Sequence, residues 1–186
     1  LMQKDIGETK RKELAKGQKP FAIVLTCSDS RVPPEILFDQ GIGDIFIIRV
    51  AGNVVDPRVL RSIEYCAEHL NAPLLFILGH TKCGAVTATL EILETKGEPC
   101  PVAKKIMPAA EKAKKKGGTK DEVLETAIKE NVKNVYNDVM KSKIISHLVQ
   151  EDKLKIVAGE YNITTGKIEM MEKIELTKAA PGEKAH

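Results

Sequence analysis

The sequence predicts an α/β fold in which helices flank a mainly parallel central sheet, with a further strand at its C-terminal edge. Three observations support this prediction. Short apolar runs of strand length recur along the chain, at residues 21–25, 45–50, 73–79 and 154–159. Segments with apolar residues at helical spacing separate these runs, and strands that alternate with helices usually form a parallel sheet. A turn sequence at residues 164–167 then precedes the segment that we expect to form the edge strand.

Prolines mark the boundaries of several elements in the first half of the chain. After the first strand, residues 33–38 predict a short helix or turn. Pro57 suits the first position of a helix, because its ring presets the helical φ and its missing N–H has no helical partner to lose there. Pro73 ends this helix and admits the third strand, and a further helix is expected from Gly84 onward. The apolar residues at helical spacing are Val59, Leu60, Ile63, Ala67 and Leu70 in the first of these helices and Val86, Leu90 and Leu93 in the second.

The second half contains two helical segments of different character. Residues 104–118 are rich in lysine and end in two glycines, which predicts a solvated helix followed by a break. Residues 119–149 carry apolar positions at helical spacing, so we expect either one long amphipathic helix or a broken pair of helices there.

Length and composition limit the classes of protein that fit. The chain of 186 residues is 42% hydrophobic, which suits one globular domain over residues 1–186, with an N-terminal arm at 1–18 and a flexible tail at 178–186. A net charge of +3 and an aromatic content of 4% do not favour a nucleic-acid partner. No apolar run approaches the length of a membrane span, so we expect no membrane partner. We expect a cytoplasmic protein, with removal of an export signal as the alternative.

The four cysteines are spaced too irregularly to predict a disulfide framework. Cys66 lies on the apolar side of its helix and is expected to fill the core. Cys100 stands between two prolines and is expected in an exposed loop. The other two cysteines belong to a different pattern.

Cys27, His80 and Cys83 form the pattern that says most about chemistry. Cys27 follows the first predicted strand, and His80 and Cys83 follow the third. Open α/β sheets place their active sites in the crevice outside the carboxyl ends of the strands, so these side chains are expected to converge there. Two thiolates and an imidazole suit zinc, which binds such ligands in a tetrahedron. Three protein ligands leave a fourth position for water, which is the arrangement of catalytic rather than structural zinc sites.

Asp29 makes the fourth ligand ambiguous. Its carboxylate is close enough in sequence to Cys27 to bind the same metal. Arg31 follows two residues later, and in an extended stretch both side chains lie on the same side of the chain. The guanidinium could therefore hold the carboxylate away from the metal and keep it ionised. Both arrangements remain open at this point.

Several segments together resemble the β-class carbonic anhydrases. The resemblance is carried by residues 27–35, 43–53 and 79–86, which occur in the order in which the family has them, and more weakly by 159–161 and 165–167. It implies that Cys27, His80 and Cys83 bind zinc, and that Asp29 and Arg31 act as a pair beside it. In some members the aspartate ligates zinc, and in others water takes that position.

The resemblance also implies two substrate-binding residues and an oligomer. Gln40 matches a glutamine that reaches the substrate pocket across a dimer interface in many members, and Gly84 matches a position whose backbone borders the substrate. A homodimer or a dimer of dimers is implied in the same way.

The expected function is the zinc-dependent reversible hydration of carbon dioxide to bicarbonate and a proton. Zinc with neutral ligands lowers the pKa of bound water to near 7, and the resulting hydroxide attacks the electrophilic carbon of CO2. Two thiolates donate more negative charge than imidazoles do, so we expect the water at this site to be less acidic. One alternative is the hydrolysis of carbonyl sulfide or carbon disulfide, which are linear relatives of CO2. The other is a non-catalytic zinc-binding protein in which Asp29 is permanently the fourth ligand.

Overall fold

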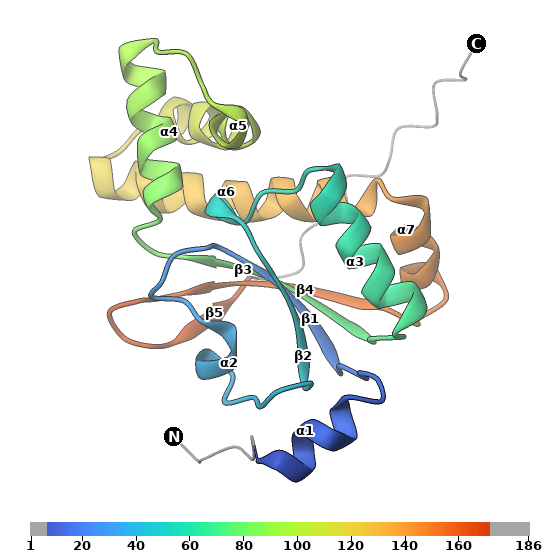
Figure 1. Ribbon diagram of the computed structural model, residues 1–186. Coiled ribbons are helices and arrows are strands. Elements are labelled where there is room, and N and C mark those ends of the chain that lie inside the picture. Colours follow the sequence, from blue (N-terminus) through green and yellow to red (C-terminus); the bar gives the residue numbers. More distant parts are fainter. Residues whose placement is uncertain (1–6, 172–186) are drawn as a thin grey trace, which may run out of the picture.

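A computed structural model describes residues 7–171, which contain a five-stranded sheet with the strand order β2-β1-β3-β4-β5 (Figure 1). The first four strands in this order are parallel, and the last is antiparallel to its neighbour. The predicted fold class and the C-terminal edge strand are therefore confirmed. The strands are β1 (Ala22–Thr26), β2 (Ile45–Arg49), β3 (Leu74–His80), β4 (Lys155–Tyr161) and β5 (Ile168–Met170).

The strand order reverses between β1 and β3. The chain moves from β1 to β2 on one side, and then crosses back to place β3 on the other side of β1. The carboxyl ends of β1 and β3 thus lie at the point where the connections diverge, and open α/β sheets bind their ligands at such points.

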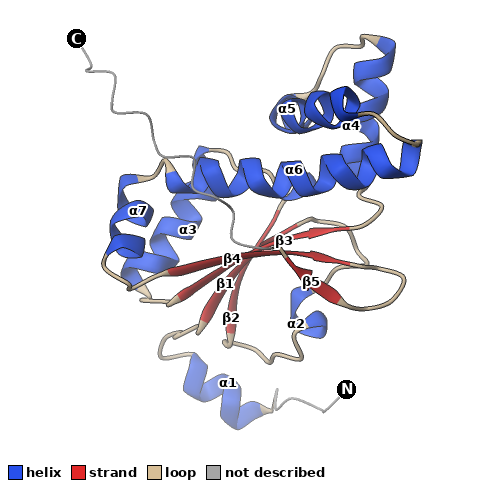
Figure 2. Ribbon diagram, turned by 180° about the vertical axis from the view of Figure 1, so that it is seen from behind, coloured by secondary structure: helices blue, strands red, loops and turns tan. Residues whose placement is uncertain are grey.

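The helices cover the two faces of the sheet unequally. The long helix α6 crosses one face together with α3 and α7, whereas α2 lies against the opposite face (Figures 1 and 2). The helices α4 and α5 pack on α6, on its side away from the sheet. The helical segments are α1 (Glu8–Leu14), α2 (Pro34–Leu37), the 3-10 turn η1 (Ala51–Asn53), α3 (Pro57–His69), α4 (Gly84–Thr95), α5 (Pro101–Lys116), α6 (Lys120–Met140) and α7 (Lys143–Gln150).

The core follows from the alternation of side chains along the strands. In β1, Ile23 and Leu25 face α3, α6 and α7, whereas Val24 faces the opposite side, where it packs with Phe76 and Leu78 of β3. All of these residues are buried, which is why their segments are continuous apolar runs. The two strands that precede the predicted ligands, β1 and β3, are thus buried on both faces.

Side-chain caps fix the first residues of the helices α6 and α7. Thr119 and Glu122 form a capping box at the start of α6, in which each side chain bonds the other residue's backbone N–H. Ser142 caps α7 by accepting a hydrogen bond from the Ile145 N–H, so the segment 119–149 forms a broken pair of helices, one of the two predicted alternatives.

The prediction of a solvated helix at residues 104–118 was incomplete. The helix α5 begins earlier, at Pro101, and one of its faces is buried against its neighbours. Small alanines allow this close packing while the lysines between them point to solvent, so lysine content concealed the buried face. The buried residues are Ala103, Ile106, Ala109, Ala110 and Ala113.

Smaller expectations have mixed outcomes. The first strand starts one residue later than predicted, and Phe21 before it is half exposed. Cys66 is fully buried and Cys100 is exposed, as expected. The N-terminal arm contains α1, and the tail predicted at 178–186 lies outside the described residues. Within residues 7–171, none of the helices combines the length and the apolar character that crossing a membrane requires.

Candidate metal centre

Three potential metal ligands converge at the carboxyl ends of β1 and β3. Cys27 directly follows β1, His80 is the last residue of β3, and Cys83 precedes the first residue of α4. Their ligand atoms all lie within 4.8 Å of one another, and all three side chains are buried. We call these residues the ligand cluster. The structure thus brings together the three side chains that the sequence predicts as metal ligands, in a group that could hold a metal ion.

The loop between His80 and Cys83 is anchored at Thr81 by two hydrogen bonds to the segment at the end of β4. The Thr81 N–H donates to the Tyr161 carbonyl at 3.0 Å, and the Thr81 hydroxyl accepts from the Ile163 N–H at 3.1 Å. Lys82 then adopts a left-handed φ of 55°, which turns the chain sharply into α4. This turn brings the imidazole of His80 and the thiol of Cys83 close to each other at the candidate metal centre.

The two ring nitrogens of His80 have different surroundings. Nδ1 lies 2.9 Å from the Thr81 carbonyl, to which it donates when it carries the proton. That tautomer leaves a lone pair on Nε2, which is buried and has no hydrogen-bond partner among residues 7–171. A buried polar atom without a partner is costly unless something else satisfies it. A metal ion bound at Nε2 would satisfy this atom. The unpartnered Nε2 is therefore evidence that the three side chains fit a metal ion.

The sulfurs of Cys27 and Cys83 lie within 4.8 Å of each other. The interaction of the two thiols, with Cys83 as the donor, is the main cause that lowers the pKa of Cys27. The same interaction, followed by burial, raises the pKa of Cys83. The Gly52 N–H also donates to the Cys27 sulfur, at 3.2 Å. Cys27 therefore has the character of a thiolate, and a bound cation would replace the proton that remains on Cys83.

Asp29 and Arg31 form a charged pair beside the ligand cluster. The carboxylate of Asp29 accepts from the Arg31 backbone N–H at 3.0 Å, from Nε at 2.9 Å and from Nη2 at 2.6 Å. These contacts, led by the side-chain bonds, hold the pKa of Asp29 well below its usual range. The carboxylate oxygen Oδ2 lies 3.9 Å from Nε2 of His80. The charged pair thus adjoins the ligand cluster and presents an ionised carboxylate to it.

Arg49 links the backbone of the ligand cluster to that of the charged pair. Its Nε donates to the Cys27 carbonyl at 3.0 Å, and its Nη2 donates to the Asp29 carbonyl at 2.5 Å. Arg49 is not among the site residues predicted from the sequence. The sequence did contain a signal for it. A charged residue at the carboxyl end of an apolar strand, on the sheet edge where the ligands are predicted, is a candidate for a role in the site.

A second supporting residue, Asn131, comes from the middle of α6. Its Nδ2 donates to the Gly52 carbonyl at 2.8 Å, and its side chain is buried. Asn131 is likewise not among the site residues predicted from the sequence. Its position between the apolar residues 128 and 135 at helical spacing placed it on the buried side of the helix, where a polar residue needs an explanation.

Gln40 and Gly84 occupy different positions relative to the centre. The side chain of Gln40 is half-buried and donates to the Phe38 carbonyl at 2.6 Å, within its own loop after α2. Gly84 immediately follows Cys83 as the first residue of α4, and a Cβ placed on it would meet no atom within 4 Å. Gly84 therefore borders open space at the centre, whereas Gln40 is held by a local contact.

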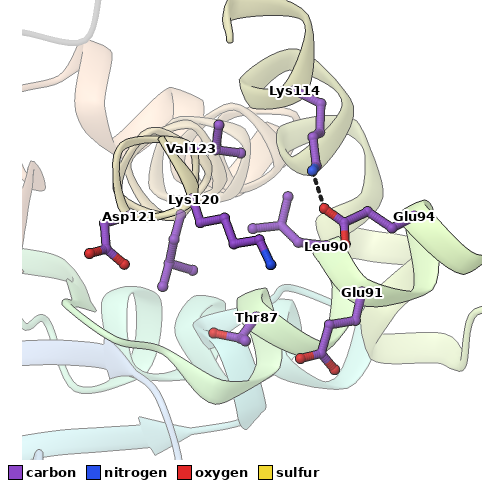
Figure 3. Close-up of a pocket in the computed structure, with 9 residues that line it drawn as sticks. Thr87, Leu90, Glu91, Glu94, Lys114, Lys120, Asp121 and Val123 are labelled. Carbon is purple, nitrogen blue, oxygen red and sulfur yellow. Dashed lines mark hydrogen bonds and ion pairs between the residues drawn. The ribbon is translucent and has the colours of Figure 1, made fainter. Parts of the chain in front are cut away.

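Two pockets lie along the first half of α6. One, of about 230 Å³, is lined in part by Thr81 and Lys82 of the ligand loop and by the buried carboxyl of Glu160, whose pKa is raised by burial. The other, of about 200 Å³, lies between α4, α5 and α6, where Lys114 points toward Glu94 and pairs with it (Figure 3). Neither pocket is lined by the ligand cluster, so both are separate from the candidate metal centre.

Comparisons of sequence identify relatives over most of the chain. The family model described as carbonic anhydrase matches residues 22–168. The carbonic anhydrase of Mycolicibacterium smegmatis is 37% identical over 169 residues, which cover 88% of this chain and 81% of that protein. Carbonic anhydrase 2 of Mycobacterium tuberculosis is also 37% identical over 169 residues, which cover 88% of this chain and 80% of that protein.

Comparisons of structure identify the same fold. The β-carbonic anhydrase CcaA has a TM-score of 0.78 at 22% identity, over 87% of this chain and 84% of that chain. A tetrameric β-carbonic anhydrase from Sordaria macrospora has a TM-score of 0.75 at 23% identity, over 87% and 85% of the two chains. From its sequence relatives and its fold together, the chain belongs to the β-class carbonic anhydrase family.

Proposed function

We propose that the protein is a carbonic anhydrase that catalyses the reversible hydration of CO2 to bicarbonate and a proton at a zinc ion. The observation that carries this proposal is the ligand cluster, in which two sulfurs and the unpartnered Nε2 of His80 lie within 4.8 Å of one another at the reversal of the strand order. Membership of the carbonic anhydrase family supports CO2 hydration as the reaction. The two thiols and the imidazole of the ligand cluster support zinc as the metal.

Zinc suits these ligands better than magnesium or calcium does. Cys27, His80 and Cys83 offer two soft thiolates and one imidazole, whereas magnesium and calcium prefer oxygen ligands. Three protein ligands leave one of four tetrahedral positions available. When bound there, zinc would lower the pKa of a water molecule, although less than at a site of three imidazoles, and so would supply hydroxide for attack on the carbon of CO2.

Asp29 and Arg31 would orient the reacting water. Arg31 engages both carboxylate oxygens of Asp29, so the carboxylate is turned toward the guanidinium, which lowers the pKa of Asp29 and keeps it ionised at neutral pH. An ionised carboxylate accepts a hydrogen bond and fixes the direction of the donor's lone pairs. This pairing favours water over Asp29 as the fourth ligand, because ligation by Asp29 would require the carboxylate to give up contacts with Arg31.

Gly84 and Gln40 are the proposed substrate-binding residues. Open space at the Cβ position of Gly84, together with its place at the start of α4, suits the approach of a small anion such as bicarbonate to backbone N–H groups. Gln40 would serve a pocket completed by a second copy of the chain, for which it would have to release the Phe38 carbonyl.

The exposed surface around β2 supports the proposal that the protein forms a homodimer or a dimer of dimers. β2 is an edge strand of the sheet, and its isoleucines and Phe46 are only half-buried. Ile36 and Ile42 nearby in the chain are exposed. An apolar edge of this kind invites pairing unless something covers it, and a second copy is the simplest cover. Analytical ultracentrifugation would contradict this proposal if it found only monomer at micromolar concentration.

A cytoplasmic location is proposed on chemical grounds. All four cysteines are free thiols among the described residues, and two of them are the proposed metal ligands. A reducing compartment keeps such thiols available to the metal. Fractionation of the source cells would test this location directly.

Stopped-flow measurement of CO2 hydration on zinc-quantified protein, across pH, tests the proposed function. We expect a rate that is proportional to bound zinc and that rises with pH. Turnover of carbonyl sulfide or carbon disulfide is measured on the same samples. A zinc-loaded protein that is inert toward CO2 contradicts the proposal, and faster turnover of the sulfur compounds would assign it to that chemistry instead.

A further inference from the structure

We propose that Asn131 is a positioning residue for the metal ligand Cys27, and that it acts through the backbone of Gly52. The inference rests on the proposed metal centre, and it deepens that proposal by assigning a role to a helix that carries none of the ligands. It concerns how the protein sets the charge on one sulfur.

Two hydrogen bonds in series carry the inference. Nδ2 of Asn131 donates to the Gly52 carbonyl at 2.8 Å, and the Gly52 N–H donates to Sγ of Cys27 at 3.2 Å. Asn131 and Gly52 are both buried and are 79 residues apart in the chain. The series therefore connects α6, through the turn η1, to the ligand Cys27 that follows β1.

The turn at Gly52 is one that needs an external support. Gly52 has φ 65° and ψ 18°, a left-handed conformation that glycine can adopt and also readily leave. A Cβ at this position would lie 2.7 Å from Cδ1 of Ile106 and 3.3 Å from Cβ of Ala85, so the site excludes other residues. Only glycine fits the space at this position. Because the glycine backbone is flexible, however, the direction of its N–H group is not fixed by the residue itself. The bond from Asn131 removes that freedom.

The burial of Asn131 is itself informative. Ile128 and Val135 lie on the same side of α6 and are buried apolar residues, as is typical of a helix face against the core. A buried amide costs free energy unless it is hydrogen-bonded, and an apolar residue of the same size would avoid that cost altogether. Packing alone therefore does not explain an asparagine here, whereas the bond to the turn of Gly52 does.

The expected consequence lies in the metal–sulfur bond. A hydrogen bond to a thiolate stabilises the charge on sulfur and reduces its donation to a bound cation. If Asn131 is replaced, the Gly52 N–H is no longer held in line, and Cys27 donates more strongly. In cobalt-substituted protein the thiolate-to-cobalt charge-transfer absorption should then move to longer wavelength, because less energy is needed to remove an electron from the sulfur.

The test compares Asn131→Leu with the parent protein and with Val135→Ala, each loaded with Co2+. Leucine has nearly the shape of asparagine and cannot donate. Val135 lies one turn further along the same helix face and is also buried, so Val135→Ala perturbs the packing of α6 without removing the bond. We expect the charge-transfer band to move to longer wavelength in Asn131→Leu and to stay in place in Val135→Ala. Asn131→Ala, which also lacks the donor, replaces the leucine variant if that variant does not fold.

The outcomes separate this inference from the proposal on which it rests. An unshifted band in Asn131→Leu or Asn131→Ala would overturn it. An equal shift in Val135→Ala would also overturn it, because the cause would then be general packing. A parent protein that shows no thiolate-to-cobalt band at all would overturn the metal centre itself, and the inference with it.

Discussion

The ligand cluster and the charged pair are neighbours that are held in place in different ways. Cys27, His80 and Cys83 are 5%, 1% and 2% exposed, and they lie at the carboxyl ends of β1 and β3, two strands that pair with each other. The side chains of Asp29 and Arg31 are 15% and 51% exposed. They are joined to each other over two residues of sequence, and Arg31 also donates to the Lys82 carbonyl at 3.3 Å. The pairing of distant strands thus builds the proposed metal site, whereas a mainly local contact builds the group that would orient the water. Metal binding and catalysis should therefore respond separately to substitution.

The largest expected effect comes from removing a ligand. Cys83→Ser should lose most of the bound zinc and lower the rate of CO2 hydration by more than about a hundredfold, which exceeds the usual cost of losing a residue that only supports a ligand. Cys100→Ser is the matched control, because it makes the same change at an exposed cysteine. Zinc content and stopped-flow rates are the measurements. A Cys83→Ser protein with full zinc and full activity would contradict the assignment of the ligand cluster.

The second-largest effect would distinguish the role of the charged pair from that of the ligand cluster. Arg31→Ala removes the two side-chain hydrogen bonds that orient the Asp29 carboxylate, and should lower activity by about ten- to a hundredfold while zinc content stays at the parent value. Arg61→Ala is the control, because it breaks another arginine–carboxylate pair, to Glu64 on α3. Loss of zinc in Arg31→Ala would show that the charged pair supports the metal, and that the proposed separation is wrong.

An intermediate effect is expected at Arg49, which bonds to both regions. Arg49→Lys keeps the positive charge, but an ammonium lacks the planar fork that reaches the Cys27 and Asp29 carbonyls together. We expect a decrease in CO2 hydration of about tenfold, with a smaller loss of zinc affinity. The measurements are the hydration rate and competition with a chelator. Unchanged values for both would mean that the two loops hold their positions without this side chain.

The smallest effect concerns stability at low pH. The pKa of Asp29 is lowered in the folded state, so its ionisation stabilises the fold at pH values above its unfolded pKa of about 3.9. That contribution is lost as the pH falls through the lower, folded value. Asp29→Asn should therefore be less stable than the parent at neutral pH, with a difference that shrinks progressively below about pH 4. The difference should be small, because Arg31 faces solvent.

Urea unfolding of the two proteins at several pH values measures this effect. A difference that grew on acidification would contradict the direction of the pKa shift.

The fold and the ligand cluster could be predicted because local sequence contains most of what fixes them. Continuous apolar runs mark the buried strands, and the parallel arrangement then brings Cys27 and His80 to the same edge. The spacing of Asp29 and Arg31 indicated their contact for the same reason, since two residues suffice to form it. The prediction of one helix or two at 119–149 was left open, and Ser142 decides it by capping the second helix.

The supporting residues were not predicted, because their roles depend on contacts between distant segments. Asn131 meets Gly52 across 79 residues, and Arg49 meets Cys27 across 22. The buried face of α5 was missed because alanines among lysines give little sequence signal until the neighbouring helices are known. What the sequence alone leaves out is therefore the layer of residues that orients the ligands, and not the ligands themselves.

The most direct test of the central claim is a zinc titration of metal-depleted protein, followed by the rate of CO2 hydration. If the ligand cluster is the catalytic centre, activity should rise in proportion to added zinc and stop rising at one zinc per chain, and Cys83→Ser should show no such rise. A rate that stays at the uncatalysed value while one zinc per chain binds would contradict the account.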